Sequence, residues 1–304
     1  MAVKRPDRAR YFVAWALVLA ALLGGCGSGG RQLLDRAEAS WRKGRYYDAI
    51  RENEELYNFE RRGRNAARAL MNLGNIYYLN LRQLKQAIEY YNKLTAEFPD
   101  SPEALQARRQ LAGIYAKEIN DPGQAILEYD KILATRNLED RNEILFQRAD
   151  AYFKNEDYFR ALRELRSLED SGITGHLADQ VSLQIGSIYL IQKKFADAVA
   201  PFQKVLTALC LDCRRRAILN LAETYENLFD FDDALATLNR LDKSPENDQF
   251  IQREISRINE KRMRIERGDG LGLPPTRQES AARPAKGGSA AKRITTGKSG
   301  ETKR

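Results

Sequence analysis

The chain has 304 residues, 43% hydrophobic and 30% charged, so it can bury a core and still be soluble. The formal net charge of +8 lies at the two ends, with +3 in residues 1–25 and +5 in residues 268–304. Residues 26–267 are therefore neutral, which argues against a surface that follows a nucleic-acid backbone. Three Cys, one His and no glycine-rich phosphate loop leave little for catalysis, so we predict a protein that is not an enzyme and needs no cofactor.

The N-terminus has the order of a secretory signal. Four basic residues between positions 4 and 10 precede an apolar run over residues 11–23, and Gly24, Gly25 and Cys26 follow. As a helix this 13-residue run would be about 20 Å long, short of the roughly 30 Å hydrocarbon core of a bilayer. A cleaved signal is therefore favoured over the alternative, a membrane-spanning signal anchor with an incidental Cys.

The residues Leu23-Gly24-Gly25-Cys26 resemble a bacterial lipobox. The resemblance implies removal of residues 1–25 and attachment of lipid to Cys26, although Gly24 stands where Ala or Ser is more usual. Gly27 follows, not the Asp that retains such lipoproteins in the inner membrane, which implies the periplasmic face of the outer membrane. Residues 26–30 would then be the lipidated Cys and a flexible tether of about 11 Å.

Small residues recur along residues 31–245 in two series with steps close to 37 residues. A period of this length predicts a stacked array, and two small residues per unit predict two closely packed helices. The first series precedes the second by 12 or 13 residues. The first series is Ala37, Gly74, Ala112, Ala149, Gly186 and Ala222, and the second is Ala49, Ala87, Ala125, Ala161, Ala198 and Ala234.

The fifth unit displays the pattern most clearly, with Gly186, Tyr189, Phe195, Ala198 and Phe202 at helical spacings. Such spacings place the apolar residues on one stripe of each helix. The Tyr three positions after the first small residue is expected to fill the space beside it. The second and third units have one extra residue between their helices, at residues 80–84 and 120–123.

The pattern resembles the tetratricopeptide repeat. The resemblance implies an all-α superhelical solenoid of six helix-turn-helix repeats over residues 31–245, although steps of 36 to 38 residues exceed the usual 34. The segment 98–104 resembles the inter-repeat turn of lipoproteins from the beta-barrel assembly machinery and of the Tol-Pal-associated division coordinator. Pro99 cannot continue a helix, Ser101 can cap the next one, and Pro102 suits its first position.

After the repeats we predict a turn at residues 242–247 and a last helix over residues 248–267, within a capping segment of residues 246–267. Its apolar stripe comprises Ile251, Ile255, Ile258 and Ile265, which favours a cap on the sixth repeat over a partner-binding helix. Residues 268–304 have almost no large apolar side chains, so we expect a disordered basic tail. Such a tail either contacts lipid head groups and other polyanions or only aids solubility.

Cys210 and Cys213 form a CxxC pair, and a disulfide is the first expectation in an exported protein. A free thiol pair and a redox-active site are the alternatives. A helix start near Cys213 could lower the thiol pKa, as in redox sites, but no thioredoxin-like strand pattern surrounds the pair. Arg214 excludes the CxxCH haem motif. His176 falls in the connection between the fourth and fifth repeats, with its only Cys neighbours far along the chain, so we expect a loop histidine and no metal site.

The resemblance also implies a partner-binding groove. It would be lined by residues of each first helix that stand six and three positions before the small residue, and one and four positions after it. Met71 stands where a Lys would be needed to bind the C-terminal carboxylate of a partner. We therefore favour a partner segment, extended or helical, that binds through apolar side chains. The alternative is that the large aromatics pack within the superhelix. The groove candidates are Trp41, Met71, Asn75, Tyr78, Arg109, Phe146, Asp150, Phe153, Leu183, Leu190 and Glu223.

These features imply a lipid-anchored periplasmic scaffold that binds protein segments during envelope biogenesis. Together with the resemblance of the turn at residues 98–104, they make outer-membrane barrel-protein assembly the leading expectation. Type IV pilus or secretin assembly and a Tol-Pal division role stay open, and a thiol-disulfide redox protein is a distant alternative. The expected partners are protein segments in the groove and a membrane reached through the N-terminal lipid, and no nucleic acid.

Overall fold

A computed structural model describes residues 29–242 and 245–268. The predicted signal segment, Cys26 and the predicted tail from residue 269 lie outside these residues. Residues 29 and 30, assigned to the flexible tether from the sequence, are helical. In the described part of the chain, no helix is both long enough and apolar enough to cross a membrane.

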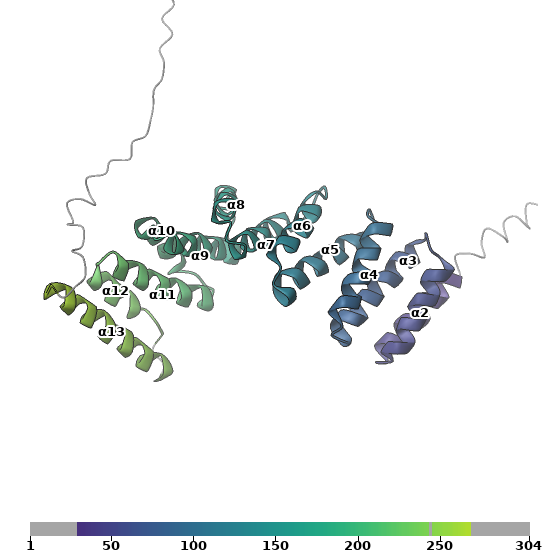
Figure 1. Cartoon of the computed structure of the whole chain (residues 1–304), viewed down its shortest axis with the longest axis horizontal. Coiled ribbons are helices and arrows are strands. Elements are labelled where there is room, and N and C mark those ends of the chain that lie inside the picture. The colour runs from purple at the N-terminus through teal and green to yellow at the C-terminus, as the bar shows by residue number, and fades with distance from the viewer. Residues whose placement is uncertain (1–28, 243–244, 269–304) are drawn as a thin grey trace, which may run out of the picture. The chain divides into compact units, whose positions relative to one another are not determined.

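Within residues 29–242 and 245–268 the secondary structure is helical, with no strand. A helix over residues 29–42 comes first (Figure 1). The elements that follow are α2 (Tyr46–Phe59), α3 (Arg64–Asn75), η1 (Ile76–Asn80), α4 (Leu84–Glu97), α5 (Pro102–Gly113), η2 (Ile114–Ile119), α6 (Pro122–Leu133), α7 (Arg141–Lys154), α8 (Tyr158–Asp170), α9 (Gly175–Ile191), α10 (Phe195–Val205), α11 (Leu211–Asn227), α12 (Phe231–Leu238) and α13 (Pro245–Glu266).

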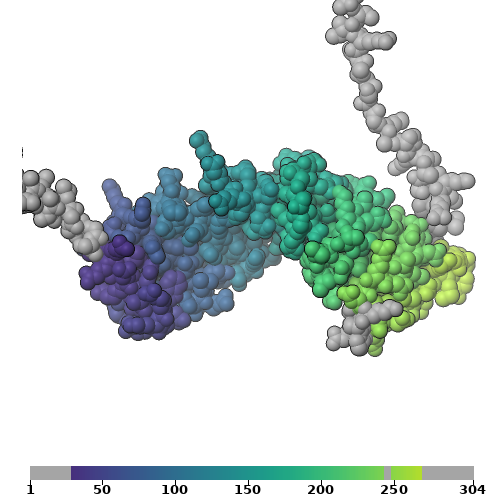
Figure 2. All heavy atoms as spheres, turned by 180° about the vertical axis from the view of Figure 1, so that it is seen from behind, coloured from purple at the N-terminus to yellow at the C-terminus, as the bar shows by residue number. Residues whose placement is uncertain are grey.

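The helices pack in chain order, which is the arrangement of a repeat solenoid. Consecutive α-helices from α2 to α10 pack against each other, and α3 and α7 also touch the first helices of the next repeats, α5 and α9. The space-filling view shows the same succession along the first unit (Figure 2). The chain divides into two compact units between Ala217 and Ile218, within α11. The predicted all-α tetratricopeptide-like solenoid is confirmed.

The connection between the two helices of a repeat follows one backbone path throughout. A residue with φ between 55° and 73° precedes the second helix in each repeat, and only in the first repeat is it a glycine. The next residue donates its N–H to the carbonyl at the conserved Tyr position, as Asp157 does to Tyr152 at 2.9 Å and Lys194 does to Tyr189 at 2.8 Å. The left-handed residues are Gly44, Arg82, Asn120, Glu156, Lys193 and Phe229.

The extra residue of the second and third repeats lies in a π-helical turn at the end of the first helix. These turns are η1 and η2, and a π-turn adds one residue to a helix without adding a loop. The N–H donor to the Tyr carbonyl is consequently one residue later, Gln83 to Tyr77 at 2.8 Å and Asp121 to Tyr115 at 2.7 Å. The connection keeps its path, and the extra residue predicted for the loop is absorbed largely by the helix.

In the second and fifth repeats the first small residue is a glycine that is packed against a ring from the second helix of the same repeat. A Cβ added to Gly186 would lie 2.6 Å from Cε1 of Phe202, and a Cβ on Gly74 would collide with the ring of Tyr91. The close approach predicted from the small residues is therefore real. The ring that requires it lies four positions after the second small residue, whereas the sequence pointed to the Tyr of the first helix.

The inter-repeat turn before α5 forms as predicted. Ser101 is the N-cap, its hydroxyl accepts a hydrogen bond from the Ala104 N–H at 3.1 Å, and Pro102 occupies the first helical position. The cap satisfies one of the free N–H groups that begin a helix, and Pro102 has no N–H to satisfy.

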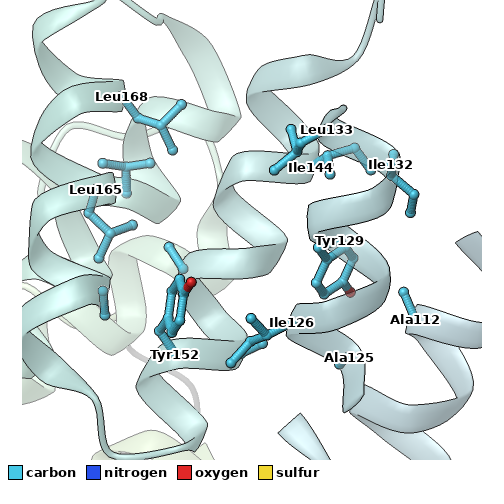
Figure 3. Close-up of a cluster of buried hydrophobic side chains, with 14 of the residues drawn as sticks. Ala112, Ala125, Ile126, Tyr129, Ile132, Leu133, Ile144, Tyr152, Leu165 and Leu168 are labelled. Carbon is cyan, nitrogen blue, oxygen red and sulfur yellow. The ribbon is translucent and has the colours of Figure 1, made fainter. Parts of the chain in front are cut away.

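The core of the middle repeats lies between α5, α6, α7, α8 and α9. Figure 3 shows Tyr129 and Ile132 of α6, Tyr152 of α7, and Leu165 of α8 within one cluster of buried side chains. Ile132 and Leu165 are fully buried. The apolar stripes predicted from the sequence thus meet in a continuous core, which fixes the positions of the helices that carry the candidate site.

In the second unit, α13 begins at Pro245, earlier than the helix start predicted at residue 248. It packs against α12, and Ile251 and Ile258 of the predicted apolar stripe are buried. Its polar side also takes part in packing. The buried Glu226 of α11 accepts hydrogen bonds from Arg257, at 2.8 and 2.6 Å, and from Lys261, at 2.9 Å.

Candidate functional site

A pocket of about 460 Å³ lies between the first helices of the third and fourth repeats. One side is α5 with η2, the other is α7, and α6 contributes Tyr129. We call it the first-helix pocket. It is lined by Arg109, Gly113, Ala116, Lys117, Tyr129, Glu143, Ile144, Phe146, Gln147, Asp150 and Lys154.

Arg109, Asp150 and Lys154 of the first-helix pocket form hydrogen bonds or ion pairs that fix their positions. Arg109 Nη2 donates to Asp140 Oδ1 at 2.9 Å, and this hydrogen bonding lowers the pKa of Asp140 below its usual value. Asp150 accepts from Lys154 at 2.9 Å and from Gln184 of α9 at 3.0 Å. Residues of neighbouring repeats thus hold the side chains of Arg109 and Asp150 in place. Because these side chains are already ordered, they would lose little conformational entropy when a partner binds.

Apolar side chains make up the rest of the first-helix pocket. Ile144 is buried, Phe146 is half-buried, and Tyr129 is 5% exposed. Burial, together with the nearby Asp150 and Glu143 carboxylates, raises the pKa of Tyr129 to about 12, so its phenol stays protonated at neutral pH. Gly113 adds open space, because a Cβ built there meets no atom within 4 Å. The pocket therefore suits an apolar side chain flanked by polar backbone or side-chain groups.

Comparison with known proteins identifies the repeat. A tetratricopeptide repeat model matches residues 68–101 and 216–247, and a second one matches residues 146–209. The chain contains tetratricopeptide repeats. No curated protein matches it.

Several solved structures have a similar fold. A tetratricopeptide repeat protein from Parabacteroides merdae has a TM-score of 0.53 and 14% identity over 82% of this chain and 95% of that one. The structure of Naa15/Naa10 bound to HypK-THB has a TM-score of 0.51 and 18% identity over 69% of this chain and 31% of that one. PilW, described as a widely conserved type IV pilus biogenesis factor, has a TM-score of 0.48 and 15% identity over 73% of this chain and 98% of that one. At these identities the likeness extends to the fold alone.

Three groove candidates of the tetratricopeptide array, Arg109, Phe146 and Asp150, come together in the first-helix pocket. Sequence reasoning did not select Lys117 and Lys154, which line the same pocket. Both stand five positions after the first small residue of their repeat, Ala112 and Ala149. Extending the position rule by one residue would have found them.

The other groove candidates are placed differently by the tetratricopeptide packing. Met71 and Leu183 are buried and have little surface for a partner. Trp41 donates its indole N–H to Asn80 at 2.9 Å, Tyr78 donates to Glu118 at 3.4 Å, and Asn75 accepts from Tyr91 at 2.7 Å. The face of the first helices in these repeats is therefore more polar than the sequence indicated.

The remaining candidates lie beyond the first-helix pocket. Phe153 packs edge-to-face against Tyr158, with ring centroids 5.8 Å apart. Leu190 is half-buried on α9, and Glu223 is exposed on α11 in the second unit. Neither lines the first-helix pocket.

The structure pairs Cys210 with Cys213 in a disulfide. It also corrects the interpretation of His176. This residue is at the start of α9 and its Nδ1 lies 3.9 Å from Cys213 Sγ, although 37 residues separate them. The starts of α9 and α11 lie close together because they are equivalent positions of two stacked repeats, one repeat length apart in the sequence.

Proposed function

We propose that this chain is a non-enzymatic scaffold that holds a segment of a partner protein against the first helices of its third and fourth repeats. The observation that carries the proposal is the first-helix pocket, which combines an apolar wall at Phe146 and Tyr129 with fixed charges at Arg109 and Asp150. An aromatic or aliphatic anchor would fill the pocket, and the charged rim would bond to the backbone beside it.

We further propose that the scaffold works at the periplasmic face of an outer membrane, tethered by lipid on Cys26. The order of basic, apolar and small residues before Cys26 supports this location. The leading envelope process is barrel-protein assembly, and the resemblance of the turn at residues 98–104 supports it together with a Tol-Pal division role. The six-repeat layout also fits lipoproteins of type IV pilus or secretin assembly. Depleting the chain and measuring barrel proteins, secretin multimers and septal constriction separates the three processes.

Site-specific photo-crosslinking tests the partner site. A photoreactive phenylalanine analogue at Phe146 should capture a partner in cells, whereas the same analogue at Phe159 should not. Phe159 is the matched control, because it is a strongly exposed phenylalanine on α8 that does not line the first-helix pocket. Equal capture at both positions, or none at Phe146, would refute the partner site.

A pocket-filling variant provides a second test of the same site. Gly113→Leu places a side chain in the open space of the first-helix pocket, and leucine favours the helix more than glycine does. The variant should fold normally and lose capture at Phe146. Undiminished capture by this folded variant would mean that the partner binds elsewhere.

Metabolic labelling tests the tether. Radiolabelled palmitate should enter the wild-type chain and not Cys26→Ala, and the variant should leave the membrane fraction. Label in both chains would show that the lipobox had been misread, without affecting the partner site.

A further inference from the structure

Three side chains from distant parts of the sequence meet beside the start of α11. The sulfurs of Cys210 and Cys213 and the Nδ1 of His176 lie within 4.8 Å of one another. Cys210 is the last residue before α11, Cys213 is in its first turn, and His176 is in the first turn of α9. Thiolate sulfur and imidazole nitrogen are the donor types that Zn²⁺ prefers.

A backbone N–H at the start of α11 is hydrogen-bonded to one of the two sulfurs. Cys210 Sγ accepts a hydrogen bond from the Cys213 N–H at 3.1 Å, so it takes the place of a capping oxygen at the start of α11. The unpaired N–H groups and the dipole at a helix N-terminus stabilise a thiolate over a thiol.

The cluster is accessible on one side. Cys213 is buried, Cys210 is half-buried and His176 is exposed. A cavity of about 380 Å³ opens beside His176 and Cys210, and Asp179, one helical turn after His176, also lines it. A cation can approach His176 and Cys210 from this cavity, and the buried Cys213 Sγ lies within 4.8 Å of both. A water or the Asp179 carboxylate would complete a tetrahedron.

We propose that the reduced chain binds one Zn²⁺ through Cys210 Sγ, Cys213 Sγ and His176 Nδ1. A dithiol reductant first breaks the Cys210–Cys213 bond, is itself oxidised to a disulfide, and leaves two thiols on the protein. Zn²⁺ then displaces a proton from each thiol and forms two Zn–S bonds and one Zn–N bond. Because the sulfurs cannot be bonded to each other and to zinc at once, the disulfide blocks the site and reduction opens it.

The observed geometry is close to what this ion needs. With Zn–S near 2.3 Å and Zn–N near 2.0–2.1 Å, a tetrahedral site places sulfur and nitrogen about 3.6 Å apart. The distance from Cys213 Sγ to His176 Nδ1 is 3.9 Å. Once the disulfide is open, the sulfurs must separate to about 3.8 Å, and Cys210 Sγ and His176 Nδ1, which lie within 4.8 Å of each other, must come to about 3.6 Å. The Cys-x-x-Cys spacing is one that zinc sites use.

The test uses the full chain with Cys26→Ser and no histidine tag, so that Cys210 and Cys213 supply the only thiols. The reduced protein, titrated with Zn²⁺ against a chromophoric chelator, should bind one ion per chain, and the oxidised protein should bind none. With Co²⁺ in place of Zn²⁺, the reduced protein should develop thiolate-to-metal charge-transfer absorption.

Variants separate a zinc site from a plain thiol pair. Cys210→Ser with Cys213→Ser should abolish binding, and His176→Ala should weaken it by at least about 100-fold, since even outer-shell changes cost 10- to 100-fold. Circular dichroism controls for folding, and His176 is an exposed residue whose loss removes no core packing. Absence of stoichiometric zinc in the reduced chain, or unchanged affinity in His176→Ala, would overturn the proposal.

Discussion

The distance between the two helices of a repeat depends on whether the first small residue has a Cβ. In the fifth repeat, Gly186 lies against the fully buried Phe202. The fourth and sixth repeats, which have Ala149 and Ala222, carry leucine at the position of Phe202. The third repeat alone combines Ala112 with an aromatic residue, Tyr129. The size of the first small residue is thus largely matched to the side chain that faces it.

This matching predicts that Gly186→Ala is destabilising despite the better helix propensity of alanine. Its Cβ would crowd Phe202 in a packed core, and overpacking of this kind costs about 1–3 kcal/mol. Urea denaturation measures the loss. The matched control is Gly113→Ala in α5, which has open space for a Cβ and should gain about 0.5–1 kcal/mol.

A second change tests the same contact. Phe202→Leu alone should destabilise the chain, but combined with Gly186→Ala it should cost less than the sum of the two single changes. If the loss of stability in the double variant equals the sum of the two single losses, the two residues do not interact.

The turn residues with positive φ make a different single-residue prediction. Lys193 has φ 57° and is exposed, and a left-handed conformation costs a non-glycine residue about 1–2 kcal/mol. Part of this cost is offset because glycine is more flexible in the unfolded chain, so Lys193→Gly should raise the free energy of unfolding by up to about 1 kcal/mol. Lys194→Gly, one residue later at φ −88°, should give no gain. A higher midpoint in thermal denaturation for Lys194→Gly than for Lys193→Gly would contradict this.

The conformation of these turn residues could not be predicted from the sequence. The small residues, apolar stripes and the Ser101 cap were readable because each has a residue type that suits its position. The left-handed turns at Arg82, Glu156 and Lys193 carry no such residue, since the Tyr carbonyl hydrogen bond and the packed helices impose the conformation. The pairing of His176 with Cys213 likewise depends on stacking of two repeats and not on local sequence.

At the scale of elements, α13 is joined to α11 by charge as well as by its apolar stripe. Burial pushes the pKa of Glu226 upward, but hydrogen bonds from Arg257 and Lys261 outweigh it and hold the pKa below its usual value. The same carboxylate raises the pKa of Arg257. The sequence predicted the apolar contact from its helical spacing, whereas an ion pair between residues 31 positions apart has no periodic signal.

The lowered pKa of Glu226 gives a pH dependence. A carboxyl with a lower pKa in the folded state than in the unfolded state stabilises the fold fully above the unfolded value, near 4.5, and this stability is lost as pH falls through the folded value. Hydrogen exchange at α12 and α13 should therefore accelerate below about pH 4.5, after correction for the intrinsic exchange rate.

A Glu226→Gln variant should show that instability already at neutral pH. We expect a loss of about 1–3 kcal/mol, at the lower end because Arg257 stays half-exposed. Glu260→Gln is the control, since Glu260 is exposed and lies 3.9 Å from Arg264. Equal effects of the two changes would show that the buried ion pair does not hold α13.

At the scale of the whole molecule, each repeat is stabilised by its neighbours. The buried cluster of the middle repeats contains side chains from α5 to α9, and a second cluster contains side chains from α2 to α5. In such an array, stability is approximately a sum of repeat terms and nearest-neighbour terms, and local opening does not require global unfolding. A pocket built between two middle repeats is therefore supported from both sides.

This organisation predicts that a core defect acts locally. Leu165 is fully buried in α8, and Leu165→Ala should cost about 2–5 kcal/mol through the cavity it leaves. Native-state hydrogen exchange should show the loss of protection in α6 to α9, where its core neighbours lie, and a much smaller change in α2 and α3. Leu127→Ala removes an exposed leucine from α6 and should change protection little anywhere. If Leu165→Ala instead lowered protection equally from α2 to α9, the first unit would unfold as one cooperative body. Partner binding at the first-helix pocket would then stabilise every repeat alike, and not only the two repeats that form the pocket.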